Sequence, residues 1–284
     1  MEQWLYGGIT VLLNYAEKIF DYFLQLGANL DSIEEFYNVS KKISKMLKLK
    51  EEGNDKDSFE LNGDIIFSNV SILTGSKSML KDLNFIIQKG EKVAILGDNG
   101  SGKSLLSKAI LGFNEYNGNI YINNHNTKRL NKSNIREYVE LVDGNSYLFK
   151  GTILENVLLK NGETNKLDKI LKDAEIYDDI QRFEEKENTF VGEKGTKLSG
   201  GQRQRISIAR TLVNDKPTVI FDEAFNKIDN NTKEKILENL VNKYNEKTMI
   251  FITHDLKITE YVDKVIYIEN NTTTVKKTNE LKLA

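Results

Sequence analysis

Residues 97–104 read Gly-Asp-Asn-Gly-Ser-Gly-Lys-Ser, and this stretch decides how the rest of the chain is interpreted. It matches the phosphate-loop (Walker A) pattern G-x-x-x-x-G-K-[ST]. Four residues occupy the fixed positions of that pattern: Gly97, Gly102, Lys103 and Ser104. A strand-like run at 92–96 precedes the loop and a helical pattern at 103–112 follows it, which is the context that such a loop requires.

The residue types of this loop suit a chain of phosphates. Glycines let backbone N–H groups turn inward, where side chains would block the phosphates, and the following helix points its partial positive end at the same place. We expect Lys103 to reach the β and γ phosphates of a nucleotide and the Ser104 hydroxyl to ligate Mg²⁺. The predicted nucleotide-binding residues are Gly97, Asp98, Asn99, Gly100, Ser101, Gly102, Lys103 and Ser104.

An apolar run that ends in two acids, Thr-Val-Ile-Phe-Asp-Glu at 218–223, fits the Walker B pattern. Because parallel strands end at the ligand-binding edge of their sheet, both carboxylates are expected near the phosphate loop. We predict that Asp222 holds Mg²⁺, directly or through water, and that Glu223 orients or deprotonates the attacking water. The alternative is that the two acids merely begin a loop.

Strand-like and helical runs alternate from residue 65 onward, which favours an α/β fold with parallel strands. Eight strands are predicted, at 64–67, 83–87, 93–96, 119–122, 139–142, 219–221, 249–253 and 265–268. Four helices are predicted, at about 103–112, 165–174, 200–213 and 232–244. The expected fold is a P-loop NTPase core with a parallel or mixed sheet, plus a helical subdomain at about 145–213.

Residues 1–47 have a different pattern. Apolar residues recur at spacings of three and four from Leu12 to Tyr37, which predicts one long helix. Charges at 17, 18 and 21 interrupt its apolar run, whereas a free-standing membrane span needs about twenty apolar residues. An amphipathic helix packed on its own domain is therefore an alternative to a membrane segment. The expected organisation is a helix at 1–47, a linker at 48–62 and a nucleotide-binding domain at 63–284.

Composition narrows the function classes. The 40 basic and 42 acidic residues give a net charge of −2, which provides no basic field for nucleic acid. The sequence has no cysteine, which excludes disulfides and thiolate metal sites, and its two histidines argue against a histidine-based zinc cluster. Because Glu2 stands where a basic region would open a secretory signal, we expect no such signal and a cytosolic location.

Residues 198–202 read Leu-Ser-Gly-Gly-Gln, which is the signature of ABC proteins. With both Walker motifs in this order, the chain resembles ABC nucleotide-binding domains over about residues 63–270. The resemblance implies a head-to-tail dimer around two Mg-ATP molecules, in which Ser199 and Gly201 contact the γ phosphate of ATP held by the other monomer. It also implies that His254, in Ile-Thr-His-Asp at 252–255, hydrogen-bonds the γ phosphate at the chain's own Walker motifs and holds the attacking water. The predicted catalytic residues are Glu223, His254 and Lys103.

The resemblance points to export more than import. Thr-Phe-Val-Gly-Glu-Lys-Gly at 189–195 looks like the segment that contacts the coupling helices in ABC exporters. The helix at 1–47 resembles the last transmembrane helix of an exporter. The implied protein is an ATPase at the cytoplasmic face of the cell membrane. Its expected partners are a second ABC domain, identical or different, and a membrane-spanning subunit or domain, with no nucleic acid.

Three positions depart from the exporter pattern. Thr74 stands where a tyrosine would stack on adenine, and such stacking is worth about 1–3 kcal/mol per base. Gly144 stands where a glutamine would link magnesium to the membrane domain, with Asn145 adjacent as a shorter substitute. The loop at 226–229 reads Asn-Lys-Ile-Asp where Ser-Ala-Leu-Asp is usual. We still expect hydrolysis, because the residues predicted to carry the chemistry are all present.

Two other functions remain as alternatives. A non-hydrolysing assembly or immunity subunit that uses ATP only for binding is favoured by the missing tyrosine and glutamine. A DNA-handling ABC ATPase would place a long coiled coil or large insertions between the Walker motifs. Only about 120 residues separate Lys103 from Asp222, and no sustained heptads lie between them.

Overall fold

The computed structural model describes residues 2–48, 58–74, 77–159, 164–269 and 272–277. The chain forms two compact units, residues 1–53 and residues 54–284, and each is described by itself. Most of the predicted linker at 48–62 lies outside the described residues.

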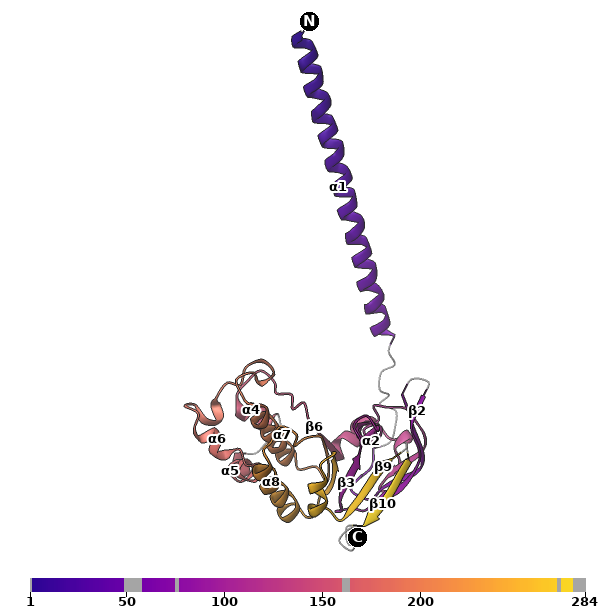
Figure 1. The fold of residues 1–284 in the computed structure, drawn as a ribbon, viewed down its shortest axis with the longest axis vertical. Coiled ribbons are helices and arrows are strands. Elements are labelled where there is room, and N and C mark those ends of the chain that lie inside the picture. The colour runs from indigo at the N-terminus through magenta and orange to yellow at the C-terminus, as the bar shows by residue number, and fades with distance from the viewer. Residues whose placement is uncertain (1, 49–57, 75–76, 160–163, 270–271, 278–284) are drawn as a thin grey trace. The chain divides into compact units, whose positions relative to one another are not determined.

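The first unit is the long helix α1 (Glu2–Leu47), as expected from its periodicity (Figure 1). No proline interrupts it, since the one proline of the chain is Pro217. Large apolar side chains such as Leu12, Phe23 and Phe36 are exposed along the helix. None of the helices in the described residues combines the length and the apolar character of a membrane span.

The second unit contains two sheets. A four-stranded antiparallel sheet has the order β2-β1-β4-β5, and a six-stranded sheet has the order β10-β9-β3-β8-β7-β6. The larger sheet is parallel from β9 to β6, with β10 antiparallel at one edge. The smaller sheet contains β1 (Ile65–Thr74), β2 (Lys77–Ile87), β4 (Tyr116–Ile122) and β5 (His125–Asn126). The larger contains β3 (Lys92–Gly97), β6 (Val139–Asp143), β7 (Thr218–Asp222), β8 (Thr248–Ile252), β9 (Lys264–Glu269) and β10 (Thr272–Lys277).

The structure confirms the α/β class but separates strands that the sequence pattern placed together. The predicted strands at 64–67, 83–87 and 119–122 belong to the antiparallel sheet. Only residues 75–76 connect β1 to β2, and so short a connection can join antiparallel strands but not parallel ones. The alternation of strand and helix therefore holds only for the larger sheet.

Helices cover both faces of the six-stranded sheet. Along β3, Val93 and Ile95 pack with α2 (Lys103–Ile110) and the antiparallel sheet, whereas Ala94 and Leu96 pack toward the helical segments. The α-helices after α2 are α3 (Lys132–Tyr138), α4 (Ile153–Leu158), α5 (Leu167–Asp173), α6 (Tyr177–Gln181), α7 (Gly200–Asn214) and α8 (Asn230–Lys243). Short 3-10 helices lie at Thr127–Arg129, Thr164–Lys166, Lys186–Asn188, Glu193–Gly195 and Leu256–Tyr261.

The first described segment of the second unit, residues 58–61, is held in place by hydrogen bonds, ring stacking and burial. The Phe59 backbone N–H donates to Asn134 Oδ1 at 3.0 Å, and Asn134 Nδ2 donates to the Phe59 carbonyl at 3.1 Å. The Phe59 ring stacks on His125, with 4.1 Å between ring centroids. Leu61, two residues later, is fully buried. Backbone, ring and core contacts together hold this segment against the antiparallel sheet and α3.

A buried lysine sets the start of the central strand β3. Lys92 is 4 % exposed, and its ammonium donates to the carbonyl oxygens of Gly90 at 2.9 Å, Asn245 at 2.6 Å and Lys247 at 2.9 Å. Burial lowers the pKa of this ammonium, an effect that the charges of Asp263 and Glu246 oppose. Lys92 thereby ties β3 to the turn that precedes β8.

Lys92→Met is expected to lower the free energy of unfolding of this unit by about 2–3 kcal/mol, because three carbonyl groups in a largely buried site lose their donor. Urea unfolding of the full chain, followed by circular dichroism, measures the change. Lys89→Met, at an exposed position three residues earlier, is the matched control and should leave the midpoint unchanged. Equal midpoints for both variants would show that the three bonds contribute nothing to stability.

Candidate active site

The predicted site residues follow neighbouring parallel strands. In the order β3-β8-β7-β6, each strand runs in the same direction, so their carboxyl ends meet at one edge of the sheet. The phosphate loop follows β3, the two acids end β7, and His254 follows β8. Sites of open α/β sheets lie at this edge. The fold thus brings together three motifs that are up to about 150 residues apart in sequence.

The phosphate loop is wound around the Lys103 ammonium. This ammonium donates to the carbonyl oxygens of Gly97 at 2.7 Å and Asp98 at 2.8 Å, and the side chain is 6 % exposed. Gly100 and Gly102 have φ values of +82° and +92°, a left-handed backbone that glycine adopts without strain. Asp98, Asn99 and Ser101 complete the loop between β3 and α2.

The same loop presents donors to a ligand. Helix α2 begins after Gly102, and no side chain of the described residues caps its first N–H groups. The Ser101 hydroxyl is buried and has no hydrogen-bond partner among the described residues. A chain of phosphates needs several hydrogen-bond donors close together. The loop offers the N–H groups at the start of α2, the Lys103 ammonium and the Ser101 hydroxyl. The loop is therefore suited to the nucleotide that the sequence predicts.

Asp222 lies directly beside the loop. Ser104 Oγ donates to its Oδ1 at 2.8 Å, and Ser107 Oγ donates to its Oδ2 at 3.0 Å. Burial raises the pKa of Asp222, the two serine hydrogen bonds lower it, and the charges of Asp143 and Glu223 raise it further. A divalent cation would favour the ionised form of this carboxyl. The oxygens of Ser104 and Asp222 are the ligand types that Mg²⁺ prefers, so the predicted metal ligands are in contact.

Sequence analysis missed Ser107, which is fully buried and holds the second oxygen of Asp222. The signal for it was available. Ser104 and Ser107 are three residues apart in the predicted helix, so they share one face of it. A serine at that spacing after the phosphate loop can donate a hydrogen bond to the same carboxylate as the first serine.

Glu223 and His254 form the third part of the site. The Glu223 backbone is left-handed, with φ +52°, and its N–H donates to the Ile252 carbonyl at 2.9 Å. Its Oε1 lies 3.3 Å from His254 Nδ1, and its Oε2 is buried without a partner among the described residues. The His254 side chain is 54 % exposed. A carboxylate with one oxygen oriented by an imidazole and one oxygen unpaired is arranged to accept a proton.

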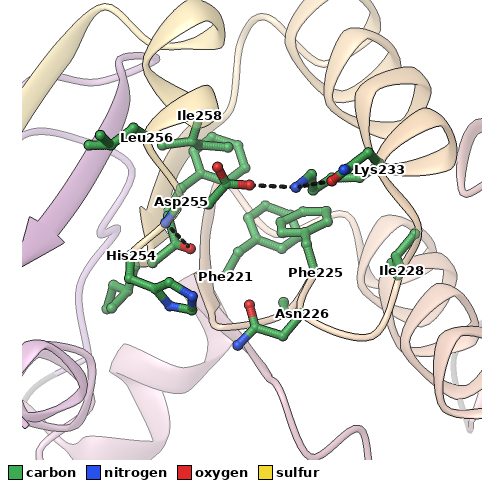
Figure 2. Close-up of a pocket in the computed structure, with 14 residues that line it drawn as sticks. Phe221, Phe225, Asn226, Ile228, Lys233, His254, Asp255, Leu256 and Ile258 are labelled. Atoms are coloured by element: carbon green, nitrogen blue, oxygen red, sulfur yellow. Dashed lines mark hydrogen bonds and ion pairs between the residues drawn. The ribbon is translucent and has the colours of Figure 1, made fainter. Parts of the chain in front are cut away.

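A cavity of about 730 Å³ opens beside His254 (Figure 2). The rings of Phe221, Phe225 and Phe251 pack together along it, with 5.1 Å between the centroids of Phe221 and Phe251. Lys233 pairs with Asp255 at its other side. Burial acts to raise the pKa of Asp255, but hydrogen bonds from the Lys233 side chain and the Lys257 backbone, together with the charges of both lysines, outweigh it and hold the pKa below its usual value. The cavity adjoins the site and contains neither the phosphate loop nor Asp222.

The signature residues lie at the start of α7. Ser199 caps the helix and forms a reciprocal capping box with Gln202. A Cβ on Gly201 would lie 2.8 Å from the Lys227 carbonyl oxygen, so this close approach requires glycine. Ser199 is exposed and Gly201 is half-buried. In the described part of the chain, neither hydrogen-bonds to the phosphate loop, and their bonds remain within the signature segment.

The departures from the exporter pattern have different structural settings. β1 ends at Thr74, whose side chain lies outside the part of the chain that the structure describes. Gly144 donates its N–H to the Asp222 carbonyl at 2.8 Å, and a Cβ there would lie 2.7 Å from the Glu223 carbonyl oxygen. A side chain at position 144 is therefore excluded unless the Walker B backbone moves. Asn145 is exposed beside it.

Comparison with known proteins assigns the family. The family model described as ABC transporter matches residues 80–226, which include both Walker motifs and the signature. The chain belongs to the ABC transporter family. This confirms the resemblance drawn from the motifs, and membership implies that the ABC domain binds ATP.

The curated relatives of this ABC domain carry ATP-binding and transport names. The Pediocin PA-1 transport/processing ATP-binding protein PedD of Pediococcus acidilactici is 37 % identical over 218 residues, which cover 74 % of this chain and 30 % of PedD. The Lacticin-481/lactococcin-DR transport/processing ATP-binding protein lcnDR3 of Lactococcus lactis subsp. lactis is 32 % identical over 284 residues, which cover 97 % of this chain and 36 % of that protein. The chain thus spans about a third of the length of the curated relatives it matches.

A lipid flippase and a solved exporter are also similar. The ATP-dependent lipid A-core flippase of Francisella tularensis subsp. holarctica (strain OSU18) is 32 % identical over 224 residues, which cover 78 % of this chain and 37 % of the flippase. The solved structure of a bacterial Atm1-family ABC exporter with ATP bound is 27 % identical, with a TM-score of 0.80. That similarity covers 94 % of this chain and 49 % of the exporter chain.

Proposed function

We propose that this ABC domain binds Mg-ATP and hydrolyses it in a dimer of two such domains to drive an exporter. The observation that carries the proposal is the convergence of three groups at one sheet edge. These are the Lys103 ammonium in its loop, the Ser104–Asp222 contact and the Glu223–His254 pair. Each supplies a different requirement of phosphoryl transfer to water.

The residues divide the work by their positions. The loop N–H groups and Lys103 hold the phosphates and offset their negative charge. Ser104 and Asp222 hold Mg²⁺, whose charge polarises the phosphate oxygens. Glu223 orients a water and accepts its proton at Oε2, which has no partner within the part of the chain that the structure describes. His254, exposed next to Glu223, donates toward the phosphate and keeps that carboxylate in place.

Dimerisation is supported by the accessibility of the signature. Ser199 and Gly201 start a 15-residue helix and form no hydrogen bond with their own phosphate loop in the described residues. The backbone N–H groups of Gly200 and Gly201 lie in the first turn of that helix, which suits an anion brought by another molecule, and the Ser199 hydroxyl is exposed beside them. We infer that this anion is the γ phosphate of ATP held by a second ABC domain, identical or different.

Export, and a membrane partner, are supported by the relatives and by surface aromatics. Tyr147, Phe149 and Phe190 are each at least 40 % exposed, and they belong to the segments at 145–151 and 189–195. Large exposed rings on a domain surface favour a protein contact. We infer that these segments contact a membrane-spanning subunit or domain, which places the ABC domain at the cytoplasmic face of the cell membrane.

The proposed organisation assigns a role to each part of the chain. We infer that 1–47 is the end of an exporter membrane domain and that 48–62 links it to the ABC domain at 63–284. The helical subdomain at about 145–213 contains the signature and the exposed aromatics. The alignment with lcnDR3 extends over 284 residues, so it includes the helix as well as the ABC domain.

Phosphate release by the purified full chain tests the proposal. We expect Mg²⁺-dependent release from ATP, with none in EDTA. Light scattering after chromatography should show ATP-dependent dimers. ATP binding without phosphate release would instead support the non-hydrolysing subunit, which the absence of glutamine at position 144 favours. Salt-sensitive binding to DNA would support the DNA-handling alternative.

Restoring the family glutamine is expected to damage this protein. Gly144→Gln should lower kcat for ATP by about tenfold or more. Its Cβ would lie 2.7 Å from the Glu223 carbonyl oxygen, so the Glu223 backbone must shift, and even a small misplacement of a catalytic group slows the reaction. Asn145→Gln is the matched control, since it lengthens an exposed amide and has no such clash. A higher kcat in Gly144→Gln would mean that the loop adapts and that the glutamine alone was missing.

A further inference from the structure

Gln204 is a buried amide that bonds to two separate segments. It lies in α7, five residues after the capping Ser199, and it is fully buried. Its Oε1 accepts the Lys227 backbone N–H at 2.8 Å, and its Nε2 donates to the Gly144 carbonyl at 3.0 Å. Since one partner is a donor and the other an acceptor, the orientation of the amide is determined by its contacts.

One of those segments adjoins the catalytic acids. Gly144 donates its N–H to the Asp222 carbonyl at 2.8 Å and packs against the Glu223 carbonyl, which would lie 2.7 Å from a Cβ at position 144. A shift of Gly144 therefore reaches the backbone of both acids. Gly144 thus links the Gln204 amide to the backbone of Asp222 and Glu223, the acids proposed to hold the metal and the water.

The other segment adjoins the signature. A Cβ on Gly201 would lie 2.8 Å from the Lys227 carbonyl oxygen, and a Cβ on Gly200 would lie 3.0 Å from Cδ of the Lys227 side chain. Lys227 is also part of the loop at 226–229 that follows Walker B and leads to α8. There is therefore no room for a side chain between the start of α7 and Lys227, and groups packed at this density transmit displacement.

We propose that Gln204 is a positioning residue that couples the two ATP sites of the dimer. The inference rests on the proposed function, in which the signature faces the partner's nucleotide whereas Asp222 and Glu223 face the chain's own. A movement of α7 toward the partner's phosphate carries the amide with it. The amide then moves Gly144 and Lys227 through its two hydrogen bonds, which aligns the acids only when the other site is filled.

A packing role alone does not account for an amide here. Burying a polar side chain costs free energy unless each polar atom is bonded, and an apolar side chain of similar volume would fill the same space. The amide uses its donor on the Gly144 carbonyl and its acceptor on the Lys227 N–H, two backbone groups that are far apart in sequence. It is this two-sided bonding that the coupling requires.

Two substitutions in the full chain test the coupling. Gln204→Met keeps the approximate volume and removes both bonds, so we expect kcat to fall about tenfold and the Hill coefficient for ATP to approach one. Gln204→Glu can still accept from Lys227 but cannot donate to Gly144 while ionised. As the pH is lowered it should recover activity relative to the natural chain, because burial raises the pKa of a carboxyl and its protonated form donates. Gln88→Met, at an exposed glutamine, is the control.

Hydrogen exchange separates the coupling from hydrolysis. On ATP binding, the amides at 143–146 and 225–229 should gain protection in the natural chain, and Gln204→Met should lose that gain while it remains folded by circular dichroism. If the natural chain gains protection but releases no phosphate, hydrolysis fails and the coupling stands. The coupling is wrong if Gln204→Met keeps both its Hill coefficient and its protection, if Gln204→Glu shows no recovery at lower pH, or if the natural chain itself gains no protection.

Discussion

Glu223→Gln is expected to reduce ATP turnover by about 10²–10⁴-fold, the range that a general base contributes. The substitution keeps the size of the side chain and removes its negative charge. Glu223 Oε1 lies 3.3 Å from His254 Nδ1, and Glu223 Oε2 is buried without a partner among the described residues. A neutral amide in that place cannot accept the proton of the attacking water.

The variant should still bind ATP, because the phosphate loop and the Ser104–Asp222 contact do not depend on Glu223. Without hydrolysis the two signatures stay on their phosphates, so a stable ATP-bound dimer should accumulate. Phosphate release and light scattering measure the two effects. Glu238→Gln, at an exposed position of α8, is the matched control. A Glu223→Gln chain with undiminished phosphate release would show that another group activates the water.

Lys103→Met is expected to act earlier, on binding itself. Its ammonium donates to two loop carbonyls at 2.7 and 2.8 Å, so its loss removes both a phosphate partner and the centre of the loop. Hydrogen bonds to charged groups are worth about 1.5–3 kcal/mol each, which corresponds to about 10–10²-fold in affinity for ATP. Turnover should fall further, because Lys103 also offsets charge that grows during the reaction.

Isothermal titration with ATP and Mg²⁺ measures this loss, and Lys108→Met, exposed on the same helix, is the control. The two site variants should then differ in kind. Glu223→Gln retains nucleotide and dimerises, whereas Lys103→Met binds ATP more weakly and dimerises less at the same ATP concentration. Tight ATP binding by Lys103→Met would place the phosphates elsewhere than in the loop at 97–104.

The parts that were predictable from sequence are those encoded by local patterns. Each predicted strand overlaps an observed one, because buried parallel strands such as β7 and β8 read as continuous apolar runs. The phosphate loop was predictable because its glycines and lysine have few alternative uses at that spacing. The short helices α3, α4 and α6 were not predicted individually, since so few residues give only a weak helical period, although α5, which is equally short, was predicted at 165–174.

Other features arise only when distant segments meet. The antiparallel sheet includes β5, a two-residue strand with no pattern of its own. A side chain at position 144 is excluded by the carbonyl of Glu223, which lies far from Gly144 in sequence. The two bonds of Gln204 likewise depend on loops that are far from it in sequence. Composition and periodicity have no access to such contacts.

The fastening of Phe59 determines where a mechanical load enters the ABC domain. Any pull transmitted along the chain from residues before 58 acts first on the paired bonds with Asn134 and on the ring of His125. Those attachments belong to the antiparallel sheet and to α3, and α3 continues directly into β6 of the larger sheet, whose edge holds the candidate site. A displacement of Phe59 would therefore reach β6, whose carboxyl end leads to Gly144 beside Asp222.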